Sequence, residues 1–232
     1  MNKIAVLSGA GISAESKLKT FRDSGGLWEG HRVEDVATPE AWARNPQLVL
    51  DFYNQRRSQL LSVVPNAGHL ALSEAESWAQ INIITQNVDD LHERAGSTTI
   101  LHLHGSLLEV KSEKDDNLIY SWTNDLKMGD QCENGNQLRP NIVWFGEAVP
   151  LIDRAYQIIS QSDYLIVVGT SLQVYPAAGL LGACRNSCHI YFVDPNADQI
   201  TTRIPKSQLS IIPLNATLGL PLALERIKKL IQ

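Results

Sequence analysis

Short runs of almost wholly apolar, β-branched residues recur along this chain, separated by longer amphipathic segments. These runs lie at 4–7, 81–85, 142–145, 164–168 and 190–193. Strands that are apolar on both faces are typical of a parallel sheet covered by helices on both sides. Segments with helical periodicity lie at 46–63, 67–79, 151–160, 176–185 and 221–231. The alternation therefore predicts an α/β fold with a doubly wound, Rossmann-like parallel sheet.

Two segments interrupt this alternation and predict a second, smaller lobe. The segment 24–45 is rich in glycine, and the segment 108–140 is polar with a charged run at its start. No linker composition separates independent domains, so we expect both insertions to pack together beside the sheet within a single domain, 1–232. The expected Rossmann-like lobe comprises 1–23, 58–107 and 141–232, and the expected small lobe comprises 24–57 and 108–140.

Charge and apolar run length argue against several classes of partner. Twenty Lys and Arg against 25 Asp and Glu give a net charge of −5, without the basic excess that nucleic-acid binding uses. Runs such as 164–168 and 177–181 are far shorter than the ~20 apolar residues of a membrane span. The chain starts without a signal-peptide pattern, and three cysteines do not suit a disulfide framework. We expect a cytoplasmic protein that binds neither nucleic acid nor membrane.

A glycine turn follows the first expected strand. Gly9, Ala10 and Gly11 stand at its end, and a helix is expected to begin near Ser13. A strand, a glycine turn and a helix N-terminus together form a diphosphate site, because free N–H groups and the helix dipole favour anions. No third glycine follows at the spacing of dinucleotide-binding proteins, so a plain tight turn is the alternative.

Two later strand ends carry residues that suit a nucleotide. Gly169, Thr170 and Ser171 make a second small-residue turn, and Asp194 ends another expected strand. An acidic side chain at such a position can accept hydrogen bonds from ribose hydroxyls. A turn-forming role before Pro195 is the alternative for this aspartate.

Amide, carboxylate and imidazole groups gather near two further strand ends. Gln86, Asn87 and Asp89 follow the run at 81–85, at the sheet edge where open α/β sheets bind ligands, although polar residues also form turns there. His102 and His104 are two apart on an expected strand and share a face, so one of them is a candidate general base. A metal pair or buried structural histidines are the alternatives. These residues alone do not decide between the two histidines.

Taken together, these motifs resemble the sirtuins, the NAD-dependent protein-lysine deacylases. The resemblance covers nearly the whole chain, and the motifs occur in the same order as in the family. They are Gly9-Ala10-Gly11-Ile12-Ser13, Thr20-Phe21-Arg22, Thr85-Gln86-Asn87-Val88-Asp89, His102-Leu103-His104-Gly105, Phe145-Gly146-Glu147 and Gly169-Thr170-Ser171. The segment 27–57 makes the chain most similar to short bacterial sirtuins and to the mitochondrial desuccinylase type.

The resemblance implies transfer of the acyl group of an acyl-lysine to NAD, which gives nicotinamide, O-acyl-ADP-ribose and free lysine. It implies that His104 is the general base, that Asn87 is catalytic beside it, and that His102 supports the strand. The residues that it places against NAD are Gly9, Ala10, Gly11, Ile12, Phe21, Arg22, Gln86, Asn87, Asp89, Gly169, Thr170, Ser171, Asp194 and Ala216. The family usually has Asn where this chain has Asp194, so a ribose acceptor is kept and an amide donor is lost.

One helix carries a pair of residues that suits an acidic acyl group. Tyr53 and Arg56 are three apart and share a face, where a phenol and a guanidinium can bind a carboxylate. This pair resembles the signature of desuccinylating and demalonylating sirtuins, and Ala37 matches the small residue that widens their acyl pocket. A solvated basic helix end is the alternative, since Arg57 is adjacent. We expect both deacetylation and desuccinylation or demalonylation.

The same resemblance implies how the substrate peptide binds. It is expected to pair as an added strand, mainly through main-chain hydrogen bonds, with loose sequence selectivity. The residues implied are Phe145, Gly146, Glu147, Val174 and Tyr175. Acyl-lysine proteins or peptides are therefore the expected partners, and we expect the enzyme to be a monomer.

A structural zinc is not expected. Most sirtuins hold zinc with two Cys-x-x-Cys pairs, whereas here the segments 112–115 and 132–135 retain only Cys132. A differently built site using Asp115 or Asp116 is the alternative. Apolar packing is expected to hold the small lobe instead, through residues such as Leu118, Ile119 and Trp122.

Two other functions stay open. The chain could be an NAD- or ADP-ribose-binding module, or an NAD hydrolase or ADP-ribosyltransferase that uses the same ribose-activating site. Retention of the polar and basic motif residues, such as His104, Asn87 and Arg22, argues against a mere module.

Overall fold

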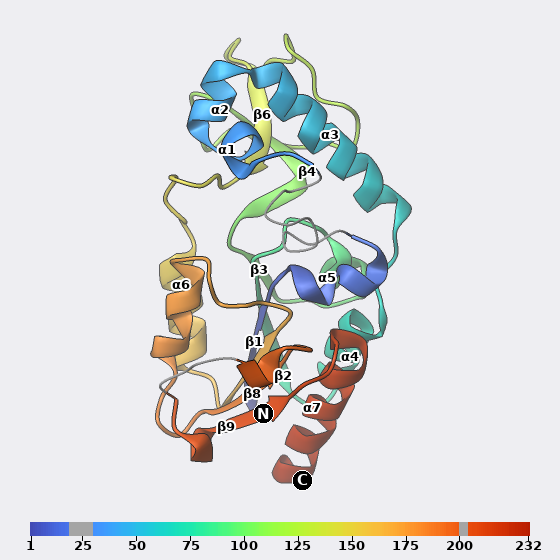
Figure 1. Cartoon of the computed structure of the whole chain (residues 1–232), viewed down its shortest axis with the longest axis vertical. Helices are drawn as coiled ribbons and strands as arrows, with labels where there is room; N and C mark the ends of the chain where they lie inside the picture. Colours follow the sequence, from blue (N-terminus) through green and yellow to red (C-terminus); the bar gives the residue numbers. More distant parts are fainter. Residues whose placement is uncertain (19–29, 200–203) are drawn as a thin grey trace.

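The apolar runs pair in a six-stranded parallel sheet whose strand order reverses near its middle. The computed structural model describes residues 1–18, 30–199 and 204–232 (Figure 1). The strands are β1 (Lys3–Ser8), β2 (Gln80–Thr85), β3 (Ile100–His102), β7 (Tyr164–Val168), β8 (His189–Val193) and β9 (Leu209–Ile212). Their order in space is β3-β2-β1-β7-β8-β9, and all neighbours are parallel. This arrangement confirms the predicted doubly wound fold, with its reversal between β1 and β7.

Helices cover both faces of this sheet. On β1, Ile4 and Val6 pack on one face, while Ala5 and Leu7 pack on the other, because successive strand residues point to opposite sides. The first face is covered by α4 (Ala67–Ala75) and α7 (Ala216–Ile231), and the second by α6 (Ile152–Ser160) and the 3-10 helix η3 (Ala177–Ala183). In the described ranges, no helix combines the length and apolar character that a bilayer crossing needs.

A second, antiparallel sheet forms the small lobe. Its strands β4 (Gly105–Ser112), β5 (Ile119–Ser121) and β6 (Leu138–Ile142) lie in the order β5-β4-β6. Helices α1 (Val33–Val36), α2 (Pro39–Arg44) and α3 (Pro46–Ser62) lie beside this sheet in the upper part of Figure 1. The predicted second lobe thus contains described residues of both inserted segments, and α3 belongs to it as well.

Two helices of this lobe begin at residues whose side chains cap the helix N-terminus. Thr38 accepts a hydrogen bond from the Ala41 N–H (3.0 Å), and Asn45 accepts one from the Leu48 N–H (3.1 Å). A proline follows each of these two capping residues, at the helix position where a missing N–H costs nothing. The caps fix the start of α3, which carries Tyr53 and Arg56.

The structure differs from the predicted elements in four places. The run 142–145 does not form a parallel strand, because Ile142 ends β6 and Trp144 is buried under the small-lobe helices. The helix expected near Ser13 is replaced by two 3-10 turns, η1 (Ala10–Ile12) and η2 (Ala14–Ser16), ended by Lys17 at a φ of 69°. The helix expected at 176–185 is the shorter η3. Strand β9 was not expected, because it is a four-residue edge strand with Ile211 exposed.

The expected lobe boundaries fall inside secondary-structure elements. The boundary after residue 57 lies within α3, which runs to Ser62, and the boundary after residue 107 lies within β4, which begins at Gly105. We propose that the boundaries between the two lobes lie at the end of α3 and at the start of β4.

The small lobe has an apolar centre at the position where a zinc site would stand. Cys132 is buried with Leu50, Val110, Leu126 and Leu138. Leu118 and Trp122 pack against this group as predicted, whereas Ile119 is 47% exposed, because it lies on the outer face of the short strand β5. Within the described part of the chain, no three His, Cys, Asp or Glu residues converge to hold a metal. The residues present do not fit a four-thiolate zinc site.

Chelation should therefore leave the small lobe intact. We expect purified protein to carry less than stoichiometric zinc, and its thermal unfolding midpoint to be unchanged after dialysis against a chelator. A midpoint that falls on chelation and recovers when zinc is restored would contradict this prediction.

Two buried histidines lie side by side below the carboxyl end of β1. His69 on α4 and His92 on α5 (Leu91–Arg94) have ring centroids 5.0 Å apart. His69 Nδ1 accepts from the Asn66 N–H (3.3 Å), and His92 Nε2 lies 3.1 Å from Ser8 Oγ. Burial lowers the pKa of His69 to about 4 and that of His92 well below its ordinary 6.5. Both side chains are therefore neutral at pH 7.

These histidines should make the fold sensitive to acid. Because the folded-state pKa of His69 lies below its unfolded value, its contribution is lost as pH falls from 6.5 towards 4. We expect His69 alone to remove about 2 kcal/mol of unfolding free energy between pH 7 and pH 5. His69→Gln keeps an acceptor for the Asn66 N–H without a titrating group, so its loss over this range in urea denaturation should be smaller by that amount. Equal losses in the two proteins would refute the assignment.

Candidate active site

A cavity of about 520 Å³ opens at the carboxyl ends of the parallel strands, where the strand order reverses. We call the part lined by the strand-end turns the sheet end, and the part lined by α3 and the loop after β6 the lobe end. Gly9, Gln86, Gly169 and Asp194 line the sheet end, each just after a different strand. Open α/β sheets bind their ligands at this position, because the two diverging connections leave a crevice there.

The turns after β1 and β7 touch each other at the base of the sheet end. A Cβ on Gly11 would lie 2.6 Å from the Gly169 Cα, and one on Gly9 would lie 2.7 Å from the Thr170 Cβ. The Gly9 N–H donates to the Val168 carbonyl (3.0 Å) and the Gly11 N–H to the Gly169 carbonyl (2.8 Å). The glycines therefore allow two turns to interlock, and their own amides are already used. Among the hydrogen bonds of the described residues, none uses the Ala10 N–H, which lies on the cavity wall.

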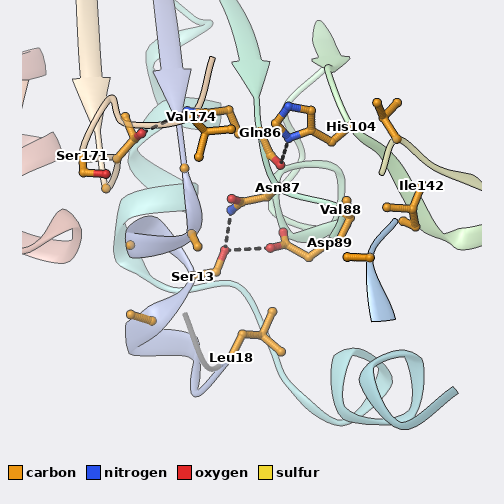
Figure 2. Close-up of a pocket in the computed structure, with 18 of the residues that line it drawn as sticks. Ser13, Leu18, Gln86, Asn87, Val88, Asp89, His104, Ile142, Ser171 and Val174 are labelled. Atoms are coloured by element: carbon orange, nitrogen blue, oxygen red, sulfur yellow. Dashed lines mark hydrogen bonds between the residues drawn. The ribbon is translucent and has the colours of Figure 1, made fainter. Parts of the chain in front are cut away.

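A hydrogen-bonded chain fixes the polar residues after β2 (Figure 2). The Asn87 side-chain amide donates to Ser13 Oγ (3.1 Å), and the Ser13 hydroxyl donates to Asp89 Oδ2 (2.9 Å). The Leu91 N–H donates to the other Asp89 oxygen (3.2 Å). Burial raises the pKa of Asp89, and these two donors oppose that shift. Ser13 thus joins the site, a role that the sequence reasoning missed because it treated Ser13 only as a helix start.

The two histidines differ in how their ring nitrogens are used. His102 Nδ1 faces the Asn87 carbonyl (3.2 Å), and His102 Nε2 faces a carboxylate oxygen of Glu93 (2.7 Å). Since both partners can only accept, both nitrogens carry hydrogen. Burial alone would lower the pKa of His102, but the Glu93 hydrogen bond and charge raise it overall. His102 is thus engaged on both sides of its ring.

His104 keeps one ring nitrogen for the cavity. Its Nδ1 lies 2.9 Å from the Gln86 carbonyl and must therefore donate, which leaves Nε2 as the unprotonated nitrogen of the neutral ring (Figure 2). Burial lowers the pKa of His104, only partly offset by the Gln86 hydrogen bond. A neutral imidazole with a free lone pair on the cavity wall is the arrangement that a general base requires.

The rest of the sheet end is assembled from β7, β8 and α7. The Gln86 amide donates to Thr170 Oγ1 (3.1 Å), and Ser171 follows on the wall. Asp194 Oδ1 accepts from the Asn196 N–H (2.9 Å). Ala216, at the start of α7, completes this wall.

Glu15 anchors the start of α7. It accepts from the Thr217 N–H (3.0 Å) and hydroxyl (2.7 Å), and from the Asn215 amide (2.8 Å). It also lies on the cavity wall, and the sequence reasoning did not single it out.

One expected nucleotide contact does not line this cavity, and two others lie outside the described residues. Ile12 is fully buried in the core beneath the sheet end and does not line the cavity, because the η1 turn points its side chain inward. Phe21 and Arg22 lie outside the described residues.

The lobe end brings Ala37, Tyr53 and Arg56 together with Trp144. Tyr53 is fully buried, and its hydroxyl accepts from the Trp144 indole N–H (3.1 Å). Burial raises the pKa of Tyr53 far above its ordinary value of 10.0, so the phenol stays protonated and can donate. The Arg56 guanidinium carbon lies 5.9 Å from the centroid of the Phe52 ring. A phenol donor and a guanidinium on one wall suit an anionic group.

The residues expected to pair with a peptide lie on the cavity wall, outside any sheet. The Glu147 N–H donates to the Trp144 carbonyl (3.0 Å), which closes a turn with Gly146 at a φ of 92°. Phe145 is 45% exposed and Tyr175 is 78% exposed, and Val174 lines the cavity beside Tyr175.

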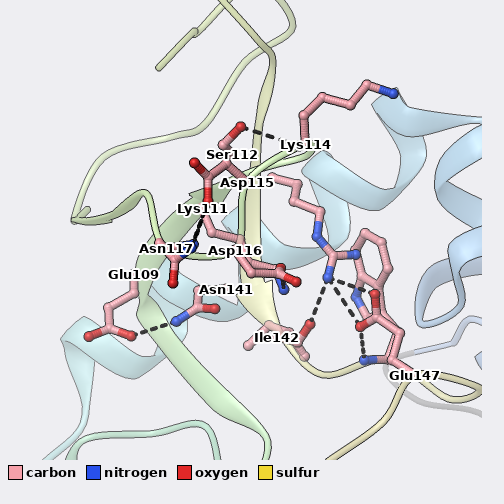
Figure 3. A network of polar contacts seen from close by, with 12 residues as sticks. Glu109, Lys111, Ser112, Lys114, Asp115, Asp116, Asn117, Asn141, Ile142 and Glu147 are labelled. Atoms are coloured by element: carbon pink, nitrogen blue, oxygen red, sulfur yellow. Dashed lines mark hydrogen bonds and ion pairs between the residues drawn. The ribbon is translucent and has the colours of Figure 1, made fainter. Parts of the chain in front are cut away.

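The Glu147 carboxylate is held within the protein. It pairs with the Arg139 guanidinium at 2.8 and 3.1 Å and also accepts the Trp144 N–H at 2.8 Å (Figure 3). Glu147 therefore shapes the wall through these bonds.

The two histidines should titrate on opposite sides of 6.5. We expect ring signals in pH-titrated NMR spectra to give His104 a pKa below this ordinary value and His102 a pKa above it. Glu93→Gln should lower the pKa of His102 and leave that of His104 in place. The reverse order of the two pKa values would show that their partners are misassigned.

Comparisons with known proteins agree with this geometry. The Sir2 family model matches residues 9–176. A Helicobacter pylori protein (strain ATCC 700392 / 26695) named NAD-dependent protein deacylase is 61% identical over 197 residues, which are 85% of this chain and 86% of that protein. A crystal structure of a Sir2 homolog–NAD complex superposes with a TM-score of 0.86 at 36% identity, covering 99% of this chain and 91% of the other. A Sir2–p53 peptide–NAD+ structure gives a TM-score of 0.73 at 26% identity, covering 98% and 92%. This chain belongs to the Sir2 family.

Proposed function

We propose that this protein removes acetyl, succinyl and malonyl groups from lysine side chains of proteins at the expense of NAD. The observation that carries the proposal is the pairing, in one cavity, of a neutral His104 with its lone pair available and a Tyr53–Arg56 wall that suits a carboxylate. With one water molecule consumed, the products would be nicotinamide, O-acyl-ADP-ribose and free lysine. The relatives named above support the reaction class.

The sheet end has the chemistry that NAD needs. The Ala10 amide can donate to a diphosphate oxygen, and the Asp194 carboxylate can accept from ribose hydroxyls. Gly9, Gly11 and Gly169 let the strand turns meet beneath it, and Thr170, Ser171 and Ala216 line its walls. We include Phe21 and Arg22 in the cofactor site on family resemblance alone.

When bound, NAD supplies the ribosyl carbon that bonds to the acyl-lysine amide oxygen as nicotinamide leaves, and it carries the acyl group away. His104 Nε2 accepts a proton from a hydroxyl group that lies against it. The Gln86 carbonyl accepts the hydrogen bond from Nδ1–H and so stabilises the positive charge that forms on the ring. Ser13 orients the Asn87 amide and the Asp89 carboxylate as one unit. Asn87 and Gln86 would position the ribose, and Asp89 the nicotinamide amide.

The lobe end would receive the acyl group. The Tyr53 hydroxyl and the Arg56 guanidinium can each donate to a terminal carboxylate, and such charge-assisted bonds are among the stronger ones in proteins. Ala37 is nearly fully buried on this wall and leaves room that a larger side chain would fill. An acetyl group would occupy the same space without using these donors.

The peptide would lie along the cavity mouth. The turn at Phe145, Gly146 and Glu147 and the segment at Val174 and Tyr175 both reach the wall with backbone outside any sheet, so they can pair with an extended chain. We further propose that the protein acts as a monomer in the cytoplasm. Its net charge of −5 favours protein over nucleic-acid substrates.

Nicotinamide release tests this proposal. Purified protein with NAD should release nicotinamide only when an acetyl-lysine or succinyl-lysine peptide is present. His104→Ala should lower kcat/KM with either peptide by about 10²- to 10⁴-fold, because the general base is lost. Arg56→Met should raise the KM for the succinyl peptide alone.

Two outcomes would reject the proposal. Release without peptide would indicate an NAD hydrolase, and no release with any peptide would indicate a binding module. His102→Asn serves as the matched histidine control, because it removes an imidazole that has no nitrogen left for the cavity. Its kcat/KM should fall far less than that of His104→Ala.

A further inference from the structure

We propose that Trp144 determines acyl-group specificity as a positioning residue, by fixing the Tyr53 hydroxyl as a donor to the carboxylate of an acidic acyl group. The inference rests on the proposed function, since it concerns the lobe end of the same cavity.

The hydrogen bond between Trp144 and Tyr53 has only one possible direction. The Trp144 Nε1 and the Tyr53 hydroxyl oxygen are 3.1 Å apart, and the two residues are 2% and 0% exposed. An indole N–H can only donate, so the phenol oxygen accepts. The hydroxyl hydrogen of Tyr53 must therefore point away from the indole. Both residues line the cavity together with Arg56, so an acidic group that enters the lobe end would supply an acceptor for this hydrogen.

Neighbouring side chains hold the Trp144 indole in place. The Arg139 guanidinium carbon, from β6, lies 3.8 Å from the centroid of the Trp144 ring. Glu147 ties Arg139 and the Trp144 backbone together through the ion pair and hydrogen bond described above. The Trp42 ring packs at 5.9 Å from that of Trp144, at an angle of 38°. Arg139 and Trp42 thus contact the indole ring without involving its N–H, and Glu147 holds Arg139 and the Trp144 backbone beside each other.

A fixed indole affects how the lobe end binds a carboxylate. Because the stacking contacts hold the ring plane, the N–H has one direction available, and the Tyr53 hydroxyl loses the freedom to rotate. A donor that is already oriented binds a carboxylate more tightly than one that must be ordered on binding. An acetyl group has no carboxylate and gains nothing from this arrangement. Trp144 should therefore affect succinyl and malonyl substrates selectively.

Steady-state kinetics on Trp144 variants test the proposal. Trp144→Phe keeps an aromatic ring beside Arg139 and removes the N–H. We expect it to raise the KM for a succinyl-lysine peptide about tenfold, with kcat and the acetyl-lysine KM nearly unchanged. Trp144 replaced by benzothienylalanine, which has the shape of tryptophan without the N–H, should behave in the same way and guards against a packing defect.

A double-mutant cycle identifies Tyr53 as the intermediary. Tyr53→Phe should raise the succinyl KM, and the Tyr53→Phe/Trp144→Phe pair should raise it no further than Tyr53→Phe alone. Trp42→Phe is the matched control, since it keeps an aromatic ring against Trp144 and leaves the Trp144–Tyr53 hydrogen bond in place. It should leave the ratio of succinyl to acetyl KM unchanged.

Three results would overturn the proposal. They are an unchanged succinyl KM in the benzothienylalanine variant, an equal loss with both peptides, or additive effects in the cycle. If Arg56→Met is selective for the succinyl peptide while the Trp144 variants are not, this inference fails and the proposed function stands. If neither peptide is turned over by the wild-type protein, both fail together.

Discussion

The arrangement of this protein depends on a close contact between two backbone turns at the point where the sheet reverses its strand order. Gly11 and Gly169 approach so closely that a Cβ on Gly11 would lie 2.6 Å from the Gly169 Cα. This contact lies directly beyond the paired residues Ile4–Ser8 of β1 and Tyr164–Val168 of β7, where the connections that follow the two strands diverge to opposite faces of the sheet. The crevice above the contact is the sheet end of the cavity, which residues that follow β1, β2, β7 and β8 line.

Residues of the same type have different roles in this protein because their hydrogen-bond partners differ. His102 and His104 have the same side chain two positions apart, yet Glu93 and the Asn87 carbonyl engage one ring completely, while the Gln86 carbonyl leaves the other ring one lone pair. At the lobe end, Arg57 donates to the Leu107 carbonyl (2.8 Å) and to Asn54 (2.7 Å), which makes it structural, whereas its neighbour Arg56 lines the cavity. In both cases the environment assigns the role.

The sequence predicts the fold well, because the parallel strands are buried on both faces and read as apolar runs. The same pattern wrongly predicted a parallel strand at 142–145. Trp144 is apolar because it is buried under the small-lobe helices and not because it lies in the parallel sheet. Motif residues from distant segments were predicted to share one site, and most of them do line one cavity. Ser13 and the Trp144–Tyr53 bond could not be predicted, because they depend on distances between segments that only the folded chain fixes.

We propose that one cavity holds a nucleotide at its sheet end and an acidic acyl group at its lobe end. A crystal structure with an unreactive NAD analogue and a succinyl-lysine peptide tests it most directly. We expect the diphosphate above the Gly11–Gly169 contact and a ribose hydroxyl within hydrogen-bond distance of His104 Nε2. The succinyl carboxylate should lie within hydrogen-bond distance of Tyr53 and Arg56. A nucleotide bound elsewhere, or a succinyl carboxylate directed into solvent, would contradict it.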